Sequence, residues 1–142
     1  EAKKIRMKNL LVYLSFLHVS LCFSQQGYPI IIGENMNEKN VLSVQLLMDG
    51  ENIVLNQNEN KNYELDSIVV NKIESKFLKI DLIVKKNKKY RFFVEKEHLL
   101  MCGDLFLDLQ KGKYCRKSFN YYYRVCGSYG VSSSMGEIIK ID

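Results

Sequence analysis

Along most of the chain, apolar and polar residues alternate with a period of two, which is typical of β-strands that face a core on one side and water on the other. Segments with this pattern, or with a short apolar run rich in strand formers, lie at 28–32, 41–48, 52–55, 63–70, 77–85, 90–94, 104–109, 119–126 and 137–141. In the first of them Pro29 suits an edge strand, because an edge tolerates a missing backbone donor.

Two connections carry the signature of a tight turn. Asp49 and Gly50 stand between two apolar runs, and glycine accepts the positive φ that a two-residue hairpin turn requires. The polar residues 86–89 separate the strands expected at 77–85 and 90–94, which predicts a second hairpin. Residues 95–102 are the one stretch compatible with a helical turn or two.

About seven to nine short strands, polar turns and no evident internal repeat predict an all-β fold. We expect a single antiparallel β-sandwich domain over residues 25–142, a length of about 118 residues that can bury one core. Immunoglobulin-like and transthyretin-like sandwiches share this strand spacing. That analogy concerns architecture and implies no function.

The segment before this domain has the pattern of a helical secretory signal peptide. A basic start at Met7–Lys8 precedes the apolar run 10–19, and Ser24 offers a small residue at the exit. We expect a signal peptide over 7–24 cleaved near Ser24, residues 1–6 as an upstream extension, and a secreted or periplasmic protein. The apolar run is shorter than the about 20 residues of a spanning helix, so no integral membrane span is expected after cleavage.

Two other interpretations of the leader are less favoured. An uncleaved anchor or a buried N-terminal helix fits the flanking residues less well than cleavage does. Lipid attachment at Cys22 requires a small residue just before the cysteine, and Leu21 occupies that position.

Removing the leader changes the charge of the protein. The whole chain carries a formal +5, of which residues 1–24 contribute +3 from four basic residues and one acidic residue. The remaining +2 is too small to indicate a nucleic-acid-binding protein, and we expect no nucleic-acid partner. Lysine is also far more abundant than arginine, whereas phosphate recognition favours arginine.

Three cysteines remain after the leader: Cys102, Cys115 and Cys126. In an oxidising compartment we expect one disulfide and one free thiol. Cys115 with Cys126 is the favoured pair because both flank a tyrosine-rich segment, and Cys102 is then free. Cys102 as a partner in the bridge stays open.

A different class of function would centre on His98 and Cys102, which lie four residues apart and share a face if the segment is helical. They would form a thiol-dependent site, or a zinc site together with Cys115 and Cys126. The close cysteine pair of most structural zinc sites is missing, so we expect no metal, no cofactor and no catalytic residues. The acidic pairs Asp104/Asp108 and Glu95/Glu97 are better explained as the wetted face of a sheet.

Two surfaces are candidates for binding. The lysines Lys86, Lys88 and Lys89 belong to a basic cluster at the second predicted turn, for which a solvated turn is the simpler interpretation. In the tyrosine-rich segment, Phe119, Tyr121 and Tyr123 are expected in the core. Tyr122 and Arg124 alternate with them and are the better binding candidates.

These observations favour an exported, non-catalytic binding or accessory module, whose partner is a protein or glycan. The alternatives are an exported thiol- or zinc-dependent enzyme at His98 and Cys102, and a secreted inhibitor or effector that docks through the Tyr/Arg face. No sequence pattern identifies the ligand or the oligomeric state.

Overall fold

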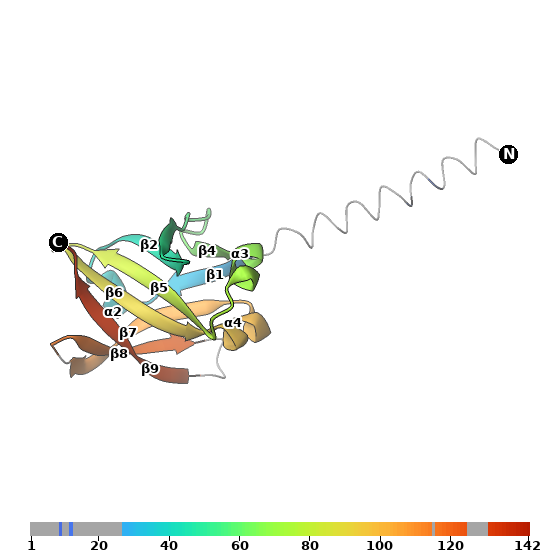
Figure 1. Ribbon diagram of the computed structural model, residues 1–142. Helices are drawn as coiled ribbons and strands as arrows, with labels where there is room; N and C mark the ends of the chain where they lie inside the picture. Colours follow the sequence, from blue (N-terminus) through green and yellow to red (C-terminus); the bar gives the residue numbers. More distant parts are fainter. Residues whose placement is uncertain (1–8, 10–11, 13–26, 115, 125–130) are drawn as a thin grey trace.

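The computed structural model describes residues 9, 12, 27–114, 116–124 and 131–142. Within them the chain is mostly β-strand, as the alternating pattern predicts (Figure 1). The strands are β1 Gly27–Ile32, β2 Val41–Met48, β3 Glu51–Val54, β4 Tyr63–Asp66, β5 Phe77–Val84, β6 Lys88–Glu95, β7 Leu105–Tyr114, β8 Ser118–Arg124 and β9 Val131–Lys140. Three short helices join them: α2 Glu34–Asn37, α3 Ser67–Lys72 and α4 Lys96–Cys102.

The nine strands form one hydrogen-bonded order, β3-β2-β5-β6-β9-β8-β7-β1-β4. Figure 1 shows this sheet strongly curved, with α3 and α4 near the same end. Both predicted hairpins are present as β2–β3 and β5–β6. Asp49 and Gly50 adopt φ of 52° and 79°, the positive values expected of that turn.

The sequence predicted antiparallel strands, and this is wrong for one pair. β1 runs parallel to β7, with Ile30 opposite Leu105 and Ile32 opposite Leu107. A parallel pair requires a long connection, and residues 33–104 supply one. β1 is therefore an inner strand between β4 and β7, not an edge strand. Pro29 is tolerated there because the ladder with β7 begins one residue later, at Ile30.

The prediction of a strand over 63–70 is confirmed for its first half and wrong for its second half. The strand ends at Asp66, whose side-chain Oδ1 accepts the backbone N–H of Ile68 at 2.8 Å. This cap satisfies an otherwise unpaired donor and starts α3 at Ser67. The predicted helical stretch at 95–102 is confirmed as α4, whereas α2 was not predicted.

One hydrophobic core lies inside the curve. Alternate residues of the central strands supply it, including Ile80 and Leu82 of β5 and Phe92 of β6. Phe119 of β8 is buried, as predicted, and its ring contacts Phe92 in an edge-on arrangement with 5.3 Å between centroids. Gly136 of β9 is opposite Phe119 in the sheet register, and its missing side chain leaves room for the Phe119 ring. A Cβ at Gly136 would be 2.4 Å from Cζ of Phe119.

Candidate functional site

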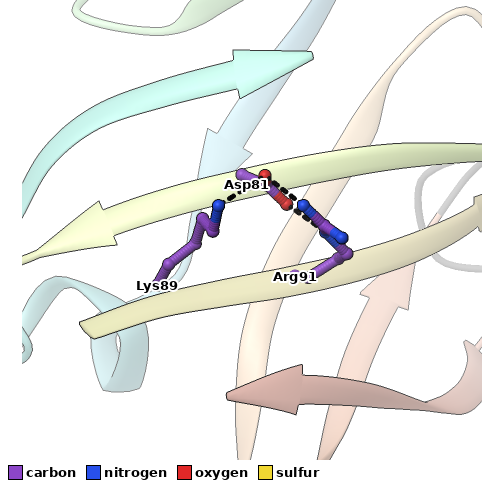
Figure 2. A network of polar contacts seen from close by, with 3 residues as sticks. All are labelled: Asp81, Lys89 and Arg91. Atoms are coloured by element: carbon purple, nitrogen blue, oxygen red, sulfur yellow. Dashed lines mark hydrogen bonds and ion pairs between the residues drawn. The ribbon is translucent and has the colours of Figure 1, made fainter. Parts of the chain in front are cut away.

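A buried ion pair lies on the opposite face of β5 from this core. Asp81 alternates with the core residues Ile80 and Leu82, yet it is 0% exposed. Nε of Arg91 donates to Oδ1 of Asp81 at 2.8 Å, and Nη2 donates to Oδ2 at 2.9 Å. Nζ of Lys89 approaches the same carboxylate at 3.6 Å. Figure 2 shows both cations extending from β6 toward Asp81 on β5.

The strand register extends this ion pair into a polar row across four strands. Gln45 of β2 is opposite Asp81, which is opposite Arg91, which is opposite Glu137 of β9. The hydrogen bonds to Asp81 raise the pKa of Arg91 above its usual value, the charges of Asp81 and Glu137 act in the same direction, and partial burial opposes them. Arg91 is therefore a fixed cation whose charge is directed toward carboxylates of its own chain.

The ion pair changes the assignment of the predicted basic cluster. Lys89 lies against Asp81 with its side chain only 17% exposed, so its charge is largely offset. Lys86 lies in the turn between β5 and β6 and is exposed. Lys88 is also exposed and is opposite Lys140 of β9 in the sheet register. Lys85, which precedes Lys86 in the chain, is exposed as well, so Lys85, Lys86 and Lys88 carry the exposed positive charge of this cluster.

An open groove of about 830 Å³ lies beside Lys88, along β9 and the start of β8. The cations that line it are Lys88, Arg116, Lys117 and Lys140. Glu137 is the one carboxylate among its lining residues in the described part of the chain. Phe93 and Met135 add apolar surface, and Met135 is 63% exposed. This basic groove combines excess positive charge with an adaptable apolar side chain.

Sequence reasoning missed three of the four cations in the basic groove. Arg116 and Lys117 precede β8, and Lys140 ends β9, so they are far from Lys88 along the chain. The order β6-β9-β8 brings them together, and the backbone N–H of Ile138 donates to the carbonyl of Lys117 at 3.1 Å. No local pattern in the sequence reveals this register.

The side chains of the Tyr/Arg face and of all the cysteines lie outside the described part of the structure. Tyr122 and Arg124 belong to β8 by their backbone, and their side chains lie outside the described part of the structure. Cys115 and Cys126 also lie outside the described residues, so the predicted disulfide stays a prediction. Cys102 is the last residue of α4.

His98 lies one helical turn before Cys102 on α4. Its Nε2 is 3.2 Å from Oε2 of Glu95, and its side chain is 39% exposed. Among the described residues, no three His, Cys, Asp or Glu side chains are grouped as a metal ion would require. The contact of His98 with Glu95 connects α4 to the end of β6.

The interpretation of the acidic pairs as a wetted sheet face is wrong for Glu97 and Asp108. Glu97 lies on helix α4 rather than on a strand. Asp108 is 9% exposed rather than part of a wetted sheet face, because α2 packs over β7. Its Oδ1 accepts the backbone N–H groups of Met36 and Leu109, each at 2.8 Å, and its Oδ2 accepts Nδ2 of Asn35 at 3.3 Å. Asp108 thus satisfies donors at the start of α2, a structural task.

Comparison of the chain with known families, proteins and structures gives no match that would indicate a function. No family model matches the chain, no curated protein matches it, and no solved structure matches it. In the described part of the chain, no helix is both long enough and apolar enough to cross a membrane. The functional argument therefore rests on the surfaces themselves.

Proposed function

We propose that this protein is an exported, non-catalytic binding module of the β-sandwich class, and that its basic groove binds an acidic segment of a protein partner. Export follows from the leader pattern over residues 7–24. The sandwich assignment is supported by the single core, to which strands from both halves of the sheet order contribute.

The composition of the basic groove carries the functional proposal. Four cations against one carboxylate favour an anionic ligand, because complementary charge steers association and suppresses partners of the same sign. Exposed apolar surface at Met135 favours a polypeptide with apolar side chains over a purely polar ligand. An acidic segment with interspersed apolar residues satisfies both conditions.

The neighbouring ion pair also bears on the proposal that the ligand of the basic groove is an acidic segment. Lys89 and Arg91 are turned toward Asp81, so they add little free charge to the outer face of β5 and β6. The basic groove, by contrast, has four cations and one carboxylate among its described lining residues. Such a localised patch is suited to a short acidic segment.

The test measures binding of a fluorescent peptide that alternates glutamate with leucine, by anisotropy at low salt. K117E/K140E reverses two charges in the groove, and K39E/K61E changes the net charge equally at two exposed positions that do not line it. We expect K117E/K140E to weaken binding at least about tenfold, whereas K39E/K61E changes it by less than about threefold.

Two results would overturn the proposal. Equal weakening by both double variants would mean that net charge, not the groove, attracts the peptide. Binding of an acidic polysaccharide such as alginate, with no binding of the peptide, would replace the protein partner by a glycan. Circular dichroism of each variant verifies that the fold is retained.

A further inference from the structure

The two edge strands of the sheet, β3 and β4, are connected by the residues that follow β3. The backbone N–H of Glu64 donates to the carbonyl of Asn56 at 3.3 Å, and that of Asn58 donates to the carbonyl of Asn62 at 2.8 Å. An isolated bridge pairs Gln57 with Tyr63 between these two bonds. The residues that follow β3 therefore join β4, while β3 itself does not.

Beyond this junction the edges separate around a second groove, which we call the seam groove. It has a volume of about 520 Å³ and is open to solvent. Ile53 and Val54 of β3 line one side, and Leu65, Asp66 and Ile68 line the other. The seam groove thus lies between a sheet edge and the start of α3.

The free backbone of β3 faces the seam groove. Leu55 donates its N–H to the carbonyl of Val44 in β2 at 2.9 Å, so its backbone points away from the groove. Alternation along a strand then directs the backbone groups of Asn52 and Val54 the other way, as it directs the Asn56 carbonyl toward β4. Among the described strands, β3 pairs only with β2.

The side chains around the seam groove have a definite chemical character. Val54 and Ile68 are each 59% exposed and line the groove, so they present apolar surface to a ligand. Glu64 and Asp66 are the charged residues among its described lining residues, and no lysine or arginine is among them. The seam groove is therefore apolar and negatively charged, the opposite sign to the basic groove.

We propose that the seam groove is a second docking site, which takes an extended strand of a partner polypeptide that alternates apolar and basic residues. The strand hydrogen-bonds to Asn52 and Val54 and so adds to the edge of β3. Its apolar side chains cover Val54 and Ile68, and its lysine or arginine side chains approach Glu64 and Asp66. The length of β3 corresponds to about 13 Å of added strand.

The test uses a labelled peptide of about six residues that alternates valine and lysine, and a second peptide with the same side chains and N-methyl groups on alternate amides. N-methylation removes backbone donors and leaves charge and side chains unchanged. We expect the first peptide to bind and the second to bind at least about tenfold more weakly. Equal binding of both peptides would overturn strand addition.

Variants of the protein locate the added strand. Val54→Pro removes the N–H that faces the groove, and we expect a loss of at least about tenfold in affinity. Val54→Thr, the matched control, keeps that N–H, and we expect a change of less than about threefold. Wild-type affinity in V54P would overturn the proposal, and if V54P fails to fold, the N-methylated peptide still decides it.

Two further measurements distinguish strand addition at the seam groove from binding at the basic groove and from self-association. K117E/K140E, which alters the basic groove, should bind the valine–lysine peptide as wild type does, and a loss there would place the peptide elsewhere. Analytical ultracentrifugation tests a second copy as the occupant. A wild-type dimer that V54P abolishes, without peptide binding, would replace the partner strand by the β3 edge of another copy.

Discussion

Removal of the Asp81 carboxylate should destabilise the protein far more than its position on an outer sheet face suggests. Asp81 is 0% exposed, while Arg91 and Lys89 keep side-chain exposures of 18% and 17%. Asp81→Ala leaves these two partly buried cations without their shared anion. Breaking a buried pair in this way costs about 3–5 kcal/mol, and the remaining exposure of the cations places the expected cost at about 3 kcal/mol.

The assay is urea unfolding followed by far-ultraviolet circular dichroism and by tyrosine fluorescence, since the chain has nine tyrosines and no tryptophan. With an m-value of about 2 kcal/mol/M, a loss of about 3 kcal/mol lowers the midpoint by roughly 1.5 M. The matched control is Lys76→Ala, which breaks the exposed 3.8 Å pair with Glu95. That change should stay within about 0.5 kcal/mol.

A double-mutant cycle isolates the ion pair from the packing of the side chains. Within the described part of the chain, Arg91→Ala leaves the Asp81 carboxylate with the 3.6 Å contact to Lys89 alone, and D81A/R91A removes both members of the bidentate pair. The two single changes should sum to at least about 1.5 kcal/mol more than the double variant costs. A coupling below about 0.5 kcal/mol, or a D81A cost no larger than that of K76A, would refute the reasoning.

Two other changes test the packing and the titration of the sheet. Gly136→Ala should lower the unfolding free energy by about 1–3 kcal/mol, because the new Cβ would be 2.4 Å from Cζ of Phe119 and 2.7 Å from the carbonyl oxygen of Arg91, a backbone atom. Unfolding of G136A alongside the neighbouring exposed control Met135→Ala measures this, and equal stability would contradict it. Burial raises the pKa of Tyr63 above 10.0. The unfolded chain then loses this proton first, so the contribution of Tyr63 is present below about pH 10 and is lost as pH rises through the folded pKa. Above about pH 10 the stability of wild type should therefore fall more steeply with pH than that of Tyr63→Phe, and parallel curves would exclude the effect.

Local signals in the sequence predicted the strands well. β2 begins at Val41 and ends at Met48, as its apolar run indicates, and the Asp49–Gly50 turn forms the expected hairpin. The boundary at Asp66 was missed because one side-chain cap competes with an apolar run that continues to Val70. Such a cap is worth about 1 kcal/mol, enough to decide between helix and strand where the run itself favours neither strongly.

Long-range pairing was beyond sequence reasoning. The parallel contact of β1 with β7 joins segments more than 70 residues apart, and no residue in either strand indicates direction. The basic groove has the same origin, since Lys117 and Lys140 become neighbours of Lys88 only through the register of β9 with β6 and β8. The lysine cluster at the second turn was visible in the sequence. The sequence did not show that Asp81 offsets the charge of Lys89 while Lys86 and Lys88 stay exposed.

The distribution of offset and free charges gives the two proposed docking sites opposite signs, so each selects a different kind of segment. Asp81 offsets Lys89 and Arg91 on the outer face of the sheet, so free positive charge remains around Lys117 and Lys140, whereas Glu64 and Asp66 make the seam groove acidic. One segment cannot satisfy both grooves, because their charges have opposite signs. Added salt should weaken capture at both, since exposed charges are screened beyond about 10 Å at 0.1 M. Affinity that survives high salt must come from Met135 in the basic groove, and from backbone hydrogen bonds and Val54 in the seam groove.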